Sequence, residues 1–256
     1  MKPAPFEYAA PRSLDEALAL LAEHGDEAKV LAGGQSLVPL LNFRLTRPSL
    51  VVDLNRVEGL DYMEDGRIGA LVRMRRVEQE AREPMLRRAA SFAGHPQIRN
   101  RGTACGSVAH ADPASELPCA LLALGAGVQL RSARGQRDLP IEDFLLGTYW
   151  TALEPDELLV EIELPEQPAG TRSAFVEHAR VHGDFALAGA AVVARPDALV
   201  VSLLAVADRA LRVELPAEAA DEPRQAAALA VRDLPDGYRR SLAEALVRRA
   251  LEEAAG

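Results

Sequence analysis

Cysteine is scarce in this chain, which argues against a zinc or iron–sulfur site. The 256 residues contain two cysteines, Cys105 and Cys119, which form no Cys-x-x-Cys pair and have no histidine at metal-ligand spacing. Zinc ions and iron–sulfur clusters are held by several closely spaced thiolate or imidazole ligands. We therefore expect no metal site built by this chain alone.

Long apolar runs and an excess of positive charge are lacking as well. No run reaches the roughly 18 apolar residues that a membrane-spanning helix needs, and the first residues contain no signal-peptide core. The formal net charge is −9, whereas nucleic acids and anionic membranes attract basic surfaces. The sequence therefore predicts a cytoplasmic protein with reduced cysteines, no nucleic-acid partner and no membrane insertion.

Hydrophobic periodicity and turn residues predict a mixture of helices and strands. Ser13-Leu-Asp-Glu16 is a capping box that opens a helix, and Gly25 ends that helix. The segment 165–170 is rich in proline and is the best linker candidate. Strands are expected at 28–31, 50–53, 66–72, 127–131, 158–164, 174–181, 186–194, 198–207 and 210–215, and helices at 14–24, 37–45, 84–93, 114–124, 141–146, 222–231 and 238–254.

Two glycine-bearing segments carry most of the functional information. The first is Lys29-Val-Leu-Ala-Gly-Gly-Gln-Ser36, and the second is Asn100-Arg-Gly-Thr-Ala-Cys-Gly-Ser-Val-Ala-His-Ala-Asp-Pro113. Each is predicted to be a strand that runs into a turn of small residues, where backbone N–H groups can approach a phosphate. Together they predict a diphosphate held from two sides. A plain turn before a helix is the alternative for either segment taken alone.

Several short motifs follow one another in a specific order along the chain. They are Pro3-Ala-Pro-Phe6, Ala32-Gly-Gly-Gln-Ser36, Gln97-Ile-Arg-Asn-Arg-Gly-Thr103, Gly106-Ser-Val-Ala-His-Ala-Asp-Pro113, Glu116-Leu-Pro118 and Arg180-x3-Asp184-Phe-Ala186. In this order they resemble the FAD-binding medium subunit of the molybdenum hydroxylases. That family includes the carbon monoxide dehydrogenase medium chain and the xanthine dehydrogenase flavin subunit.

The resemblance implies a fold and a function. The implied fold is α+β, of the FAD-binding PCMH and vanillyl-alcohol-oxidase type, with FAD-binding subdomains at 1–56 and 57–168 and a C-terminal sheet-and-helix domain at 169–256. The implied function is that of an oxidoreductase subunit, whose FAD takes electrons from two-iron two-sulfur clusters in a small partner subunit and passes them to an external acceptor. A large partner subunit with a molybdenum–pterin centre would oxidise the substrate, in a dimer of heterotrimers.

The resemblance also implies which residues bind FAD, while none is expected to be catalytic. Gln35 stands where related oxidases of the wider fold often carry a histidine that attaches FAD covalently, so non-covalent FAD is expected. The implied cofactor-binding residues are Lys29, Val30, Leu31, Ala32, Gly33, Gly34, Gln35, Ser36, Leu37, Arg101, Gly102, Thr103, Ala104, Cys105, Gly106, Ser107, Ala109, His110, Asp112, Leu158, Leu159, Arg180 and Phe185.

For several of these positions, a purely structural role is the alternative to cofactor binding. Asp112 is expected either to bind a ribose or ribityl hydroxyl or to cap a helix, and His110 either to lie beside the flavin ring or to be a hydrogen-bonded structural residue. Cys105 is either a reactive thiol near the cofactor or a small buried apolar residue. Core packing is the alternative for residues 158–159, and an exposed strand end is the alternative for Arg180.

Two other functions stay open. A self-contained FAD-dependent oxidase or reductase would need its own substrate pocket, and the C-terminal region is poor in aromatic and histidine residues. A non-catalytic assembly subunit would bind the dinucleotide as a structural ligand. Tyr149 and Trp150 form an aromatic pair that is expected to pack between domains or to face a partner.

Overall fold

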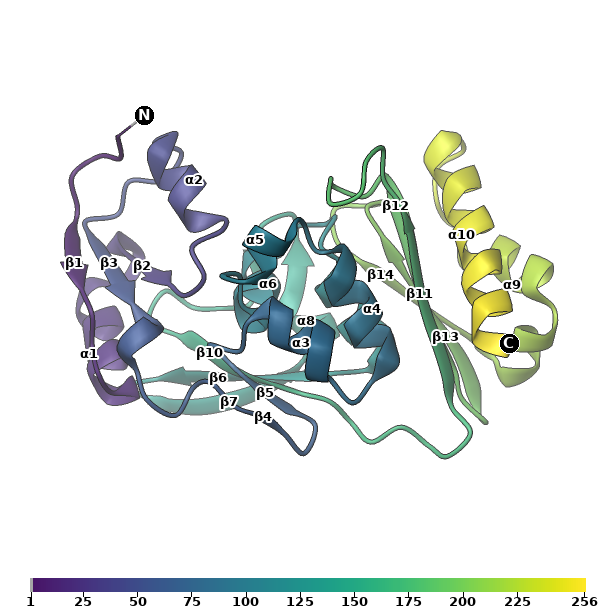
Figure 1. Cartoon of the computed structure of the whole chain (residues 1–256), viewed down its shortest axis with the longest axis horizontal. Helices are drawn as coiled ribbons and strands as arrows, with labels where there is room; N and C mark the ends of the chain where they lie inside the picture. Colours follow the sequence, from purple (N-terminus) through teal and green to yellow (C-terminus); the bar gives the residue numbers. More distant parts are fainter. Residues whose placement is uncertain (1) are drawn as a thin grey trace.

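The N-terminal sheet is small and parallel. In the computed structural model, which describes residues 2–256, its three strands are hydrogen bonded in the order β1-β3-β2 (Figure 1). The predicted capping box opens α1, because the Glu16 N–H donates to Ser13 Oγ at 3.2 Å, and Gly25 ends it with a φ of 49°. The elements of this region are β1 (Glu7–Ala9), α1 (Leu14–His24), η1 (Gly25–Glu27), β2 (Ala28–Leu31), α2 (Leu37–Asn42), β3 (Leu50–Asp53) and η2 (Leu54–Arg56).

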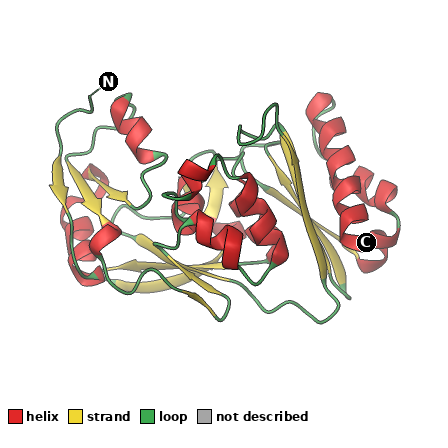
Figure 2. Cartoon of the chain, in the orientation of Figure 1, coloured by secondary structure: helices red, strands yellow, loops and turns green. Residues whose placement is uncertain are grey.

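The central sheet is antiparallel and carries a layer of helices. Its strand order is β4-β5-β10-β6-β7, and the helices lie between this sheet and the C-terminal one (Figures 1 and 2). Every residue of α7 is buried, which explains its apolar sequence. The elements are β4 (Met63–Glu64), β5 (Arg67–Gly69), α3 (Met74–Glu80), α4 (Pro84–Phe92), α5 (Pro96–Arg99), α6 (Ala104–His110), α7 (Glu116–Leu124), β6 (Gly127–Ser132), β7 (Gly135–Pro140), α8 (Ile141–Phe144), β8 (Leu145–Gly147), β9 (Trp150–Thr151) and β10 (Leu158–Glu163).

The C-terminal sheet is an antiparallel meander with helices on both faces. Helix α4 packs on one face and α10 on the other (Figure 1), and α7 packs beside α4 against β12 and β13. Burial on both faces explains why β12 and β13 are apolar at almost every position rather than alternating, with Ser202 as the buried polar exception. The elements are β11 (Arg172–His178), β12 (Ala188–Ala194), β13 (Ala198–Leu204), β14 (Leu211–Pro216), η3 (Ala217–Asp221), α9 (Pro223–Ala230) and α10 (Tyr238–Ala255).

The mixed architecture confirms the predicted α+β class, but the prediction of a strand before the second glycine turn was wrong. The second glycine segment does not follow a strand, since α5 precedes it, and much of it forms α6. Thr103 begins that helix by accepting a hydrogen bond from the Gly106 N–H at 3.1 Å. Small residues fit a helix as well as a turn, so the local sequence did not distinguish the two.

The structure also shortens one predicted strand. Strand β5 ends at Gly69 rather than at residue 72, and the Gly69 N–H donates to the Tyr62 carbonyl at 2.9 Å. A Cβ on Gly69 would lie 2.5 Å from the carbonyl oxygen of Leu60, so the chain at this point requires glycine. Among residues 2–256, no helix combines the length and the apolar character that crossing a membrane requires.

Candidate functional site

The structure brings the two glycine segments into direct contact. A Cβ added to Gly33 would lie 2.3 Å from the Arg101 carbonyl oxygen and 2.7 Å from Gly102 Cα. Both contacts are to backbone atoms, so no flexible side chain can move aside to make room for the added Cβ. Gly33 is therefore required where the first loop, between β2 and α2, touches the second loop, between α5 and α6.

The first loop leaves backbone donors free. Within residues 2–256, the N–H groups of residues 33–36 donate no hydrogen bond, although the Gly34 carbonyl accepts from the Val38 N–H at 3.0 Å. The Gln35 side chain folds back over the loop and donates from Nε2 to the Gly33 carbonyl at 3.0 Å. Free amides beside small residues are the donor set that binds phosphate oxygens.

The second loop presents the start of α6. The Thr103 hydroxyl accepts the Gly106 N–H, and a Cβ on Gly106 would lie 2.6 Å from Thr103 Oγ1. Ser107 Oγ lies 2.8 Å from Ser115 Oγ, so its hydroxyl already has a partner within the chain. Thr103 is thus a helix cap in this structure, and its own hydroxyl hydrogen remains available to a ligand.

Asp112 lies in a hydrogen-bonded turn rather than at a helix cap. Its Oδ1 accepts from the Ala114 N–H at 2.8 Å and its Oδ2 from the Tyr149 hydroxyl at 3.1 Å, whereas Ser115 occupies the cap position of α7. The His110 ring centre lies 4.9 Å from that of Tyr149, and burial lowers the pKa of His110. The neutral form of His110 is therefore favoured.

Sequence reasoning did not connect Tyr149 with the second glycine segment. Tyr149 has a φ of 54°, and its N–H donates to the Ala111 carbonyl at 2.9 Å. Tyr149 and Trp150 are 61% and 63% exposed, so neither is packed between the domains of the isolated chain. A left-handed tyrosine has no signature in the sequence, and this contact depends on how the loop folds back over α6.

The later predicted residues belong to other elements of the fold than the two glycine segments. Residues 158–159 belong to the buried core of the central sheet, which agrees with their structural alternative. Arg180 and Phe185 are exposed in the turn between β11 and β12. That turn packs on the α4–α5 connection, because a Cβ on Gly183 would lie 2.6 Å from His95 Nδ1.

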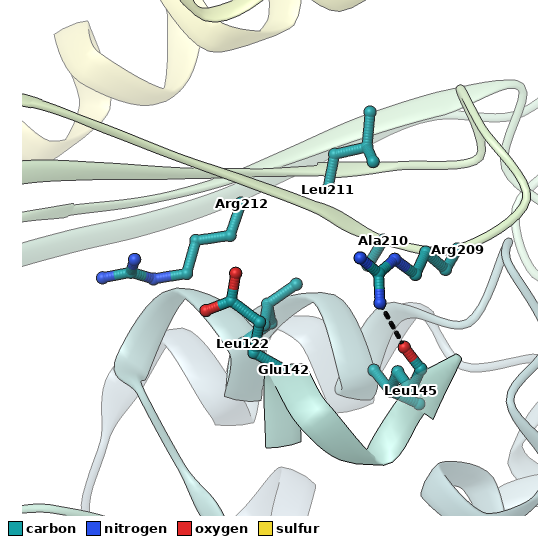
Figure 3. Close-up of a pocket in the computed structure, with 7 residues that line it drawn as sticks. All are labelled: Leu122, Glu142, Leu145, Arg209, Ala210, Leu211 and Arg212. Carbon is teal, nitrogen blue, oxygen red and sulfur yellow. Dashed lines mark hydrogen bonds between the residues drawn. The ribbon is translucent and has the colours of Figure 1, made fainter. Parts of the chain in front are cut away.

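Two pockets of the structure are lined by other residues than the glycines of the two loops. Lys29 lines an open pocket of about 440 Å³ together with Asp26, Glu27, Arg47 and Ser49. A second cavity measures about 90 Å³, which is too small for a dinucleotide. Figure 3 shows its lining by Leu122, Glu142, Leu145 and 209–212, with Arg209 donating to the Leu145 carbonyl at 2.6 Å.

Cys105 is a core residue and not a reactive thiol. It is 3% exposed, its Sγ donates to the Ile68 carbonyl at 3.6 Å, and burial raises its pKa far above the usual range. Cys119 is also fully buried, with a raised pKa. Among residues 2–256, no three His, Cys, Asp or Glu side chains are grouped so that they could hold a metal ion.

Ellman's reagent is expected to leave both thiols of the folded protein unlabelled at mildly alkaline pH. Since burial disfavours the thiolate, reaction requires unfolding, so two thiols per chain should be labelled once guanidinium chloride is added. The measurement is the absorbance of the released thionitrobenzoate. Rapid labelling of one thiol in the native protein would show that Cys105 or Cys119 is accessible.

Comparison with known proteins identifies the family. Residues 4–167 match the family described as the FAD binding domain in molybdopterin dehydrogenase. The 6-hydroxypseudooxynicotine dehydrogenase complex subunit alpha of Paenarthrobacter nicotinovorans is 48% identical over 205 residues, which cover 77% of this chain and 69% of that relative. The carbon monoxide dehydrogenase medium chain of Hydrogenophaga pseudoflava is 39% identical over 215 residues, which cover 81% of this chain and 75% of that relative.

A solved structure has the same fold over the whole chain. It is carbon monoxide dehydrogenase from Hydrogenophaga pseudoflava, which lacks the Mo-pyranopterin moiety of the molybdenum cofactor. The TM-score is 0.90 at 36% identity, over 100% of this chain and 99% of that chain. The predicted resemblance is therefore confirmed, and the chain belongs to the family of FAD-binding subunits of the molybdopterin dehydrogenases.

Proposed function

We propose that this chain is the electron-transferring FAD subunit of a molybdenum hydroxylase complex and that the FAD diphosphate binds where the two glycine loops meet. The observation that carries this location is the contact of Gly33 with the backbone of Arg101 and Gly102 beside the free N–H groups of residues 33–36. A diphosphate needs several donors converging without side chains in the way, and this junction offers them.

The other predicted residues fit this location to different degrees. Thr103 can donate its hydroxyl hydrogen, and the Asp112 carboxylate, oriented by Tyr149, can accept from a ribityl or ribose hydroxyl. Arg101 is exposed beside the loops and supplies positive charge. The subdomains 1–56 and 57–168 would hold the cofactor between them, with 169–256 as a third domain; this division is supported by the three larger sheets.

The proposed electron path is supported by the cysteine content of this chain and by the names of its relatives. Bound FAD would exchange one or two electrons at a time, and so connect iron–sulfur clusters with an external acceptor. Both cysteines of this chain are buried in its core, so the clusters belong to another subunit in this proposal. One relative is called a medium chain and another a complex subunit, which supports assembly with other subunits. In this proposal, those partners are a small iron–sulfur subunit and a large molybdenum–pterin subunit, in a dimer of heterotrimers.

Acid precipitation of the purified yellow protein is expected to release all of its flavin into the supernatant as FAD. The reason is that Gln35 stands in the loop and an amide forms no covalent bond to a flavin. The measurement is the visible absorption spectrum before and after precipitation, followed by chromatography of the supernatant.

The other outcomes separate the remaining functions. Colour that stays with the pellet, together with turnover of an added alcohol or enone, would support a self-contained oxidase. A protein that binds FAD which dithionite cannot reduce would support an assembly subunit. The electron-transfer proposal requires that bound FAD is reduced by a cluster-bearing partner and reoxidised by an acceptor.

A further inference from the structure

One arginine connects the two glycine loops through hydrogen bonds. Arg73 directly precedes α3 and donates from Nη1 to the Arg101 carbonyl at 2.6 Å and from Nη2 to Asn55 Oδ1 at 2.6 Å. Asn55 Nδ2 donates in turn to the Ala32 carbonyl at 2.9 Å. The hydrogen-bond chain therefore runs from the residue before Gly33 to the residue before Gly102.

Both ends of this bridge are held in place. The Asn55 N–H donates to Asp53 Oδ1 at 2.9 Å, and the Tyr8 hydroxyl donates to Asp53 Oδ2 at 2.5 Å. At the other end, backbone bonds join the segment around Arg73 to the second loop, because the Met74 N–H donates to the Gly102 carbonyl at 2.8 Å. Such anchors fix the Arg73 side chain, so its two bonds determine a distance between the loops.

Both hydrogen-bond partners of the Arg73 guanidinium group are neutral. Within residues 2–256 neither Arg73 nor Arg101 pairs with a carboxylate, whereas the neighbouring Arg76 pairs with Glu80 at 2.9 Å. Burial, and then the nearby charge of Arg101, lower the pKa of Arg73. The nearby Asp61 and Asp53 carboxylates offset part of this lowering of the pKa, and a bound diphosphate would add further negative charge beside the two guanidinium groups.

We propose that Arg73 and Asn55 are positioning residues that set the spacing of the two glycine loops for the FAD diphosphate. This inference rests on the proposed location of the cofactor at the loop contact. The bridge acts on the loop backbone, at the Ala32 and Arg101 carbonyls, and need not touch the cofactor. Its loss would leave both loops formed but wrongly spaced.

The test compares Arg73→Met and Arg73→Lys with Arg76→Met in the full chain, after removal of bound FAD. Arg76→Met removes a cation three residues away whose partners, Glu80 and Asp61, lie outside the bridge. We expect Arg73→Met to weaken FAD and ADP binding by about 10- to 100-fold, the range for loss of hydrogen bonds to a charged group. Arg73→Lys should lose nearly as much, because one ammonium cannot reproduce the planar two-acceptor geometry.

Riboflavin and thermal unfolding distinguish positioning from a general structural role. Riboflavin has no diphosphate, so its dissociation constant should be unchanged by either substitution at residue 73. The ligand-free Arg73→Lys protein should unfold at the wild-type temperature. Asn55→Ala in the Arg73→Met background should add little further loss of FAD affinity, since both substitutions break the same bridge.

Each outcome supports or overturns either the positioning role of Arg73 and Asn55 or the proposed location of the cofactor. Wild-type FAD affinity in Arg73→Met, or an equal loss in Arg76→Met, would overturn the positioning role. In that case, a Gly33→Ala variant that has lost FAD would show that the proposed cofactor location still stands. If Gly33→Ala also binds FAD normally, the cofactor location itself is wrong.

Discussion

Gly33→Ala is expected to abolish measurable FAD binding at micromolar concentrations, with a loss of about 100-fold or more in affinity. The added Cβ would lie 2.3 Å from the Arg101 carbonyl oxygen and 2.7 Å from Gly102 Cα, distances that real Cβ atoms do not adopt. Both neighbours are backbone atoms, so the loops must separate. Forced separation in a packed region typically lowers the free energy of unfolding by roughly 1–3 kcal/mol.

The measurement is a titration of FAD fluorescence with each variant, together with thermal unfolding of the ligand-free proteins. Gly127→Ala is the matched control, because its φ is not positive and its Cβ would meet the Leu139 carbonyl oxygen at an ordinary 3.6 Å. We expect Gly127→Ala to bind FAD like wild type. A Gly33→Ala variant whose dissociation constant stays within about threefold of wild type would show that the loop contact does not form the diphosphate site.

Glu116→Gln is expected to stabilise the protein above about pH 8 and to leave it unchanged below about pH 4.5. Glu116 begins α7 and is 7% exposed, and burial raises its pKa to about 8 from an ordinary value of 4.5. The Glu177 and Asp112 carboxylates raise this pKa further, whereas its own backbone N–H and Arg99 lower it.

The direction of this pH dependence follows from whether the folded or the unfolded protein binds the Glu116 proton more tightly. Between pH 4.5 and about 8 the folded protein holds the Glu116 proton and the unfolded chain does not, so the free energy of unfolding falls as pH rises. Glutamine stays neutral and removes this loss, which corresponds to roughly 2–5 kcal/mol on the alkaline side. The measurement is urea unfolding of wild type and Glu116→Gln at several pH values across this window.

Two further variants show how large the pH effect should be at a glutamate with a smaller pKa shift and at an exposed glutamate. Glu177 has a pKa raised by burial to about 7, so Glu177→Gln should show the same trend with a smaller amplitude. Glu80 forms an exposed ion pair with Arg76, and Glu80→Gln should change stability by less than about 1 kcal/mol at any pH. Parallel pH profiles for wild type and Glu116→Gln would contradict a buried, protonated Glu116.

Local sequence signals predicted much of the fold. The capping box at Ser13 and the glycine at residue 25 marked both ends of α1, because each satisfies orphan backbone groups that only a helix end exposes. Short polar or mixed elements such as α3, α5 and β7 were missed. Their residues have weak preferences, so packing on neighbouring elements decides their conformation.

The sequence predicted the two glycine segments of the candidate site, but not the residues that connect them in space. Both glycine segments were recognisable from the sequence, and so was their suitability for phosphate. The roles of Tyr149, Arg73 and Asn55 were not, because each acts on a residue at least eighteen positions away in the chain. No local pattern encodes such a separation in space.

The sequence by itself thus determined the α+β class, the two glycine loops, the apolar strands β12 and β13, and the family. These features depend on backbone preference, capping and hydrophobic pattern, which act over a few residues. The tertiary structure decided that Gly33 touches Gly102, that Arg73 bridges the loops, and that Glu116 is buried. Those contacts join segments far apart in sequence, and their distances are set by how the whole core packs.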